Sequence, residues 1–74
     1  MDDLEYIQEM YTEYLNKTGR QPMWLAMSWS RWWRLHDLPR SDLRGMFDEC
    51  IGKFQGKILV GINPFMDDEI VVFH

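Results

Sequence analysis

The first quarter of the chain has the apolar periodicity of an amphipathic helix. Over residues 3–18, apolar side chains return at intervals of three and four and share one face: Leu4, Ile7, Tyr11, Tyr14 and Leu15. Asp2 or Asp3 supplies an N-cap oxygen, and Gly19 suits the left-handed residue that ends many helices. The pattern therefore predicts a helix over residues 3–18.

The period changes between residues 22 and 36. Met23 to Met27 form a short apolar run after a proline, which indicates a strand. Aromatic side chains then recur at the spacing of one helical face: Trp29, Trp32, Trp33 and His36. Ser28 or Ser30 can cap the free amides, so we expect a second helix from about Ser30 to Asp37, which ends before Pro39.

A third apolar stripe follows with helical spacing: Leu43, Met46, Phe47, Cys50 and Ile51. Ser41 is a suitable N-cap, and Gly52 is a suitable C-terminal residue. Gly45 weakens the helix by roughly 1 kcal/mol relative to alanine. The pattern still predicts a third helix over residues 41–51.

The last part of the chain is rich in β-branched residues. The runs 57–62 and 69–73 flank a stretch with turn residues at both ends, which predicts a hairpin with a long loop. Both runs are continuously apolar, so we expect the hairpin to be covered on both faces, or on one face and by a partner. Gly61 has no side chain to pack and marks a candidate bulge.

The predicted elements form one small α+β domain over residues 1–74. Their order is α-β-α-α-β-β, with a three-stranded sheet covered by helices. At 74 residues the core is only marginally sufficient, and four tryptophans exceed what so small a body buries easily. We therefore expect at least one tryptophan to line a groove or a subunit contact, and the protein to be a homo-oligomer.

The charge is unevenly distributed along the chain. The net charge of −4 divides into −5 over residues 1–15, +4 over 16–57 and −3 over 58–74. An acidic chain is a poor nucleic-acid binder, since such affinity depends on lysine and arginine neutralising phosphates. Segregated charge suits a protein partner or a head-to-tail self-contact. The alternative is that these are ordinary solvated faces.

The sequence offers little for catalysis or metal binding. Cys50 is the only cysteine, which excludes an internal disulfide and indicates a reducing compartment. It lies on the predicted apolar stripe, so we expect a buried, inert thiol. His36, Cys50 and His74 do not have metal-ligand spacing. The acidic run 67–69 is typical of a solvated loop. We predict no catalytic residue, no metal, no cofactor and no enzyme activity.

The compartment is predicted from two further absences. No apolar run reaches 18 residues, and the N-terminus is acidic where a signal peptide would be basic and then apolar. We therefore expect a soluble cytoplasmic protein that does not contact a membrane.

One group of residues on the second helix combines useful chemistry. It comprises Ser28, Trp29, Ser30, Arg31, Trp32, Trp33 and Arg34. Helix amides attract anions, guanidinium groups grip phosphate and indoles stack on bases, so the group can hold a nucleotide or an acidic partner surface. In the alternative, structural interpretation, the tryptophans pack on the sheet while the arginines lie outside and pair with Glu5, Glu9 or Glu13.

Two stretches resemble a pattern from tailed-phage proteins. Residues 23–28 (MWLAMS) lead into a helix that ends in a leucine, and residues 54–72 (FQGKILVGINPFMDDEIVV) carry an aromatic-x-Gly run into the predicted hairpin. The pattern over residues 20–74 is similar to small phage reading frames and to a strand–helix–hairpin portion of the tailed-phage major capsid fold. The resemblance implies a phage origin and an α+β body.

We therefore expect a non-enzymatic, phage-type protein-interaction module that acts as a homo-oligomer. Its expected role is that of an assembly factor or a counter-defence inhibitor, with a host or defence protein as partner in the host-cell cytoplasm. Two other classes stay open. One is a nucleotide-binding or sequestering module that uses the Trp/Arg helix, and the other is a small enzyme.

Overall fold

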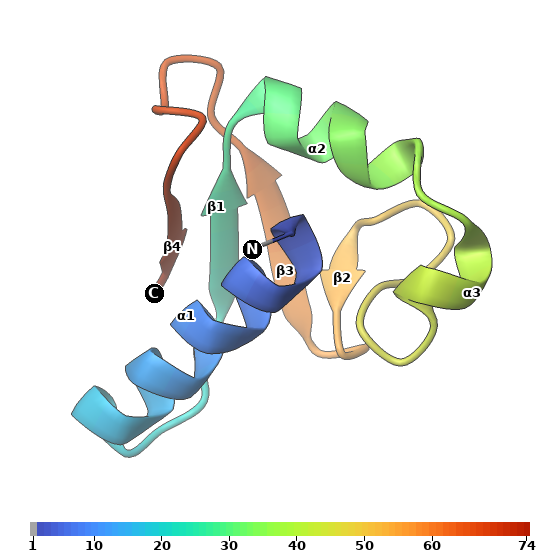
Figure 1. Ribbon diagram of the computed structural model, residues 1–74. Coiled ribbons are helices and arrows are strands. Elements are labelled where there is room, and N and C mark those ends of the chain that lie inside the picture. The colour runs from blue at the N-terminus through green and yellow to red at the C-terminus, as the bar shows by residue number, and fades with distance from the viewer. Residues whose placement is uncertain (1) are drawn as a thin grey trace.

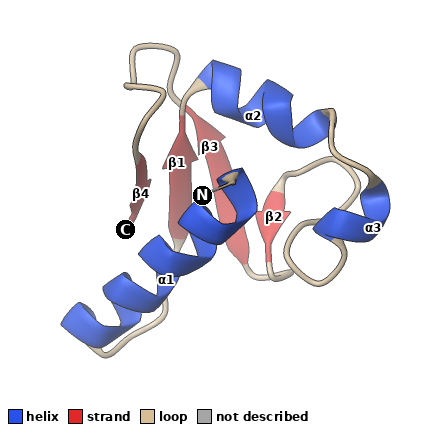
Figure 2. Cartoon of the chain, viewed as in Figure 1, coloured by secondary structure: helices blue, strands red, loops and turns tan. Residues whose placement is uncertain are grey.

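Helices and strands together form an α+β domain in the computed structural model, which describes residues 2–74 (Figures 1 and 2). The helices are α1 (Asp3–Thr18), α2 (Trp29–His36) and α3 (Arg40–Leu43). The strands are β1 (Trp24–Met27), β2 (Lys53–Phe54), β3 (Ile58–Ile62) and β4 (Val71–Phe73). The α+β class is confirmed, but the sheet has four strands rather than three.

The first helix lies where the apolar pattern predicts it. Asp2 Oδ1 accepts the backbone N–H of Glu5 at 2.8 Å, which caps the first turn. Gly19 adopts φ 68° and donates its N–H to the Leu15 carbonyl at 2.9 Å, which ends the helix. The helix crosses one face of the sheet, where Ile7 and Tyr11 are buried (Figure 1).

The predicted hairpin between residues 57–62 and 69–73 is wrong. The strand order is β2-β3-β1-β4, so β1 lies between β3 and β4, parallel to the first and antiparallel to the second. Crossing one intervening strand takes roughly 10 Å, which the connection over residues 63–70 spans easily. Asn63 and Asp67 side chains accept N–H groups two residues on, at 3.0 and 2.8 Å, and so hold the connection in local turns.

The real hairpin joins β2 to β3. Gln55 and Gly56 adopt φ 54° and 73°, and Lys57 donates its N–H to the Phe54 carbonyl at 3.2 Å. Positive φ at both central residues is the requirement of a type I′ turn, the tightest connection between antiparallel strands. No sequence pattern predicts this strand, because Lys53–Phe54 is only two residues long.

The predicted third helix over residues 41–51 is also wrong, because α3 ends at Leu43. Gly45 adopts φ 88°, which takes the backbone out of the helix. Asp48 Oδ1 then accepts the N–H groups of Gly52 and Lys53 at 2.7 and 3.0 Å, which builds a loop instead. Ser41 does not cap the helix, since Pro39 occupies the N-cap position without a side-chain bond.

The apolar stripe of that segment still supplies the core in part. Leu43, Phe47 and Ile51 are buried in the loop conformation. Cys50, which we expected to be buried, is exposed. A loop orients each side chain separately, so residues that would lie on one face of a helix can differ in burial.

Only one face of the sheet is covered by the described chain. Buried on that face are Leu25, Met27, Phe54, Ile58, Val71 and Phe73. The strand registers place Trp24, Leu59 and Val72 on the opposite face, where each is between 41% and 42% exposed. Gly61 pairs with Ala26 in an unbroken register, so the expected bulge is absent. The continuous apolar runs therefore leave one face open.

The carboxylate of Asp48 makes the loop after α3 sensitive to pH. The hydrogen bond from the Lys53 amide, ahead of all other causes, lowers the pKa of Asp48 below its ordinary value of 3.8. A carboxylate with a lowered folded pKa adds stability above the unfolded pKa, and that stability is lost as pH falls through the folded pKa.

We expect Asp48→Ala to lower the free energy of unfolding at pH 7 by about 0.5–1 kcal/mol, the usual loss for a capping side chain. Asp48→Asn keeps an acceptor oxygen and should lose less. Urea titrations at pH 7 and pH 3 should show the gap between Asp48→Ala and the wild type narrowing in acid. A gap that does not change with pH would contradict the capping role of the carboxylate.

Candidate interaction site on α2

Helix α2 begins directly after β1 because Ser28 caps it. The Ser28 side chain is buried, and its Oγ accepts the N–H of Arg31 at 3.1 Å. The helix starts at Trp29, slightly before the expected Ser30, and Ser30 itself is exposed. The short passage from strand to helix fixes the direction of α2 relative to the sheet.

Arg31 lies inside the protein and joins three segments. Its residue exposure is 5%, and its Nη1 donates to Asp3 Oδ1 at 2.6 Å. Nη2 donates to the backbone carbonyl of Asp68 at 2.5 Å, in the connection between β3 and β4. The guanidinium carbon also lies 4.8 Å from the centre of the Tyr6 ring. The expectation that both arginines lie outside is therefore wrong for Arg31.

Arg34 binds the same carboxylate from a more exposed position. Its Nε donates to Asp3 Oδ2 at 3.1 Å. This hydrogen bond is the main reason why the pKa of Arg34 rises above its already high ordinary value. The arginines thus pair with Asp3 of the first helix, and not with the expected Glu5, Glu9 or Glu13. The two guanidinium groups share this one carboxylate, so their charge is only partly neutralised within the protein.

The aromatic side chains of α2 form a cluster that we call the tryptophan surface, made of Trp29, Trp32, Trp33 and His36. The Trp29 and Trp32 rings stack with centroids 5.6 Å apart, and Trp33 stands edge-on to both. The Trp32 and His36 rings are 4.1 Å apart. Each ring is therefore held by its neighbours.

The cluster is anchored on one side and open on the other. The Trp32 indole donates its N–H to the Ile51 carbonyl at 3.3 Å and packs against the core. Trp29 and Trp33 each keep 49% of their surface exposed. The expectation that the tryptophans pack on the sheet therefore fails for these two. Fixed, exposed indoles lose little rotamer freedom on binding and are common anchors of protein interfaces.

The other residues considered for metal binding or catalysis either are bonded within the fold or do not lie together. Within residues 2–74, no three side chains of His, Cys, Asp or Glu gather as a metal site would require. The acidic run 67–69 is held locally, since Asp67 caps Glu69 and the Asp68 carbonyl binds Arg31. None of the helices in this described part is long and apolar enough to cross a bilayer.

Two features of the site have no local signal in the sequence. Asp3 reads as a helix cap, yet it is the partner of both arginines across a separation of about 30 residues. The open sheet face became visible only with the strand registers. The only related signal in the sequence is the continuous apolar character of runs 57–62 and 69–73, which predicts that both faces of these strands are covered.

Comparisons with known proteins add no relative. No protein-family model matches the chain, and neither the curated proteins nor the solved structures contain a significant match. The resemblance to tailed-phage proteins stays a prediction.

The two arginines should differ sharply in their effect on stability. Arg31→Ala removes a buried guanidinium group and leaves the Asp68 carbonyl and part of the Asp3 carboxylate unpaired, so we expect the free energy of unfolding to fall by about 3 kcal/mol. Arg34→Ala removes an exposed partner and should cost less than about 1 kcal/mol. Arg31→Lys keeps the positive charge but cannot bond Asp3 and Asp68 through two separate nitrogens, so its loss of stability should lie between those of the two alanine variants. Similar losses for the two alanine variants in urea unfolding would contradict the buried role of Arg31.

Proposed function

We propose that the protein is a non-enzymatic protein-interaction module that acts as a homo-oligomer and binds its partner through the tryptophan surface. The observation that carries this proposal is the exposure of Trp29 and Trp33 beside an anchored Trp32. A fully buried aromatic removes roughly 150–250 Å² from water, so covering the exposed halves of two indoles is worth about 4–6 kcal/mol before the costs of association. That gain is enough for a binding hot spot.

The partner class follows from the phage resemblance. A phage-type module of this size fits an assembly factor or a counter-defence inhibitor, with a host or defence protein as its partner in the host-cell cytoplasm. The first helix and the β3–β4 connection are acidic, and the segment between them is basic. Such segregation favours a protein surface of complementary charge around the apolar contact.

A nucleotide-binding module is the second candidate, and one observation favours it. The exposed rings of Trp29 and Trp33 can stack on a base. Phosphate recognition is less well supported, because Arg31 is buried and Arg34 is paired with Asp3. A thermal-shift screen of nucleotides would favour this class if one of them raised the melting temperature and if Trp29→Ala removed the shift.

The protein-binding proposal predicts that Trp29→Ala with Trp33→Ala abolishes partner binding. Trp24→Ala is the matched control, because Trp24 is also half-exposed but lies on the open sheet face. The tagged protein is used to capture host proteins. A host protein that is captured in a stoichiometric amount is then purified, and its affinity for each variant is measured by calorimetric titration. We expect the double variant to lose at least about 100-fold in affinity and Trp24→Ala to stay within about threefold.

Both variants remove half-buried rings, so their unfolding midpoints are measured as well, and affinities are compared at a temperature where every variant is folded. A double variant that retains full affinity for the purified partner would contradict the proposal. An equal loss with Trp24→Ala would move the contact to the sheet.

A further inference from the structure

Strand β4 forms one border of the sheet, and its outer edge is free within the described chain (Figure 1). On its inner edge, Trp24 and His74 exchange two backbone hydrogen bonds of 2.8 and 3.0 Å. Bonds alternate along an antiparallel ladder, so Val72 also turns its amide and carbonyl toward β1. Val71 and Phe73 therefore turn theirs outward. Such an edge is a template for another strand.

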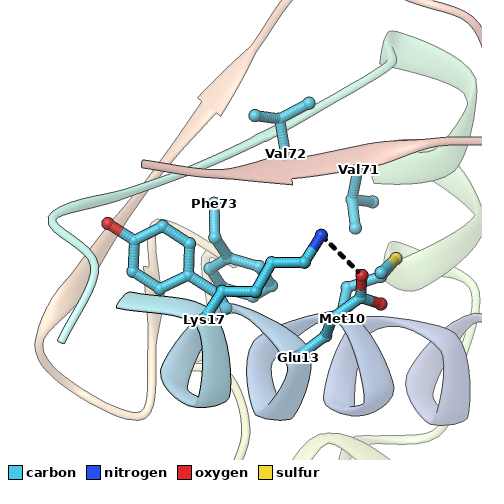
Figure 3. Close-up of a pocket in the computed structure, with 7 residues that line it drawn as sticks. Met10, Glu13, Lys17, Val71, Val72 and Phe73 are labelled. Carbon is cyan, nitrogen blue, oxygen red and sulfur yellow. Dashed lines mark ion pairs between the residues drawn. The ribbon is translucent and has the colours of Figure 1, made fainter. Parts of the chain in front are cut away.

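A groove runs beside this edge, between β4 and α1 (Figure 3). Its volume is about 180 Å³, and the apolar residues that line it are Met10, Tyr14, Val71, Val72 and Phe73. Glu13 and Lys17 stand at the groove on α1 and form an exposed ion pair of 3.2 Å. Figure 3 shows Met10 and Glu13 toward the Val71 end of the groove. The groove thus has an apolar lining and one charge of each sign.

We propose that the β4 edge is the contact between two copies of this chain, which pair antiparallel so that their sheets join across a two-fold axis at Val72. This proposal rests on the homo-oligomer part of the proposed function. In this register Val71 faces Phe73 of the second copy, so every outward amide and carbonyl of both residues finds a partner. Val72 faces its own equivalent on the open side of the sheet, where the two apolar faces become continuous.

The charges at the groove fit a second copy. A two-fold axis reverses the order of Glu13 and Lys17 in the opposite subunit, so each acid meets a base. A groove of one sign would repel itself, and an edge guarded against pairing carries an unbalanced charge, often lysine. Here Lys17 is balanced by Glu13. The edge bonds set the register, and the apolar side chains at Val72 and in the groove supply the affinity.

The test compares two lysine variants by sedimentation equilibrium. Val72→Lys places like charges opposite each other at the two-fold axis. Leu59→Lys is the matched control, because both side chains are 41% exposed on the same open face but Leu59 lies in β3, away from the edge. We expect a wild-type dimer of the 9.0 kDa chain, monomeric Val72→Lys and dimeric Leu59→Lys, each with a cooperative thermal transition that shows it to be folded.

A charge reversal tests the groove independently. Lys17→Glu leaves only acids at the contact and should weaken the dimer at least tenfold. Adding Glu13→Lys restores one charge of each sign and should restore the dimer.

Three outcomes would overturn the edge contact. If Val72→Lys remains a dimer, the edge contact is overturned while the homo-oligomer stands. The same holds if Leu59→Lys dissociates the dimer as much as Val72→Lys does. A wild-type monomer up to millimolar concentration would overturn both. Partner binding through the tryptophan surface is measured separately and is affected by none of these results.

Discussion

The ion pair between Arg31 and Asp3 connects parts of the chain that are distant in sequence. Through one guanidinium group, the start of α1, the body of α2 and the β3–β4 connection are held together. The pair is largely buried, so its formation carries a desolvation penalty, and Arg31 Nε finds no partner in the described chain. The hydrogen bonds at both Nη atoms offset that penalty. Loss of Asp3 would leave the buried charge of Arg31 without a carboxylate, which is why the arrangement of α1 and α2 depends on this contact.

The position of Arg31 decides what α2 can offer to other molecules. Arg31 and Leu35 face the interior, and Arg34 lies beside them on the Asp3 carboxylate. The helical spacing then turns Trp29 and Trp33 away from the core. A group of residues that resembles an anion site is therefore divided into an internal ion pair and an external aromatic surface. The polar chemistry stabilises the fold, and the surface that α2 leaves exposed is aromatic.

The elements with local signals were predictable from the sequence. Asp2, Gly19 and Ser28 mark helix ends because their capping bonds join residues only a few positions apart. The strand order was not predictable, because β1 pairs with both later strands through contacts that no local pattern specifies. In the segment after Leu43, the glycine at φ 88° and the Asp48 loop overrode an apolar stripe with helical spacing. The candidate site divided in the same way: periodicity identified the tryptophans, but the burial of Arg31 depends on a carboxylate 28 residues away.

The most direct measurement follows the indole N–H resonances of the four tryptophans while the purified partner protein is titrated into the labelled chain. Trp29 and Trp33 should shift or broaden at stoichiometric partner, because their rings are open to it. The resonance of Trp32, whose indole N–H is bonded to the Ile51 carbonyl, should change less. The resonance of Trp24 should keep the chemical shift that it has without the partner. Perturbation of Trp24 alone, with Trp29 and Trp33 unchanged at saturation, would contradict the assignment of the recognition surface to α2.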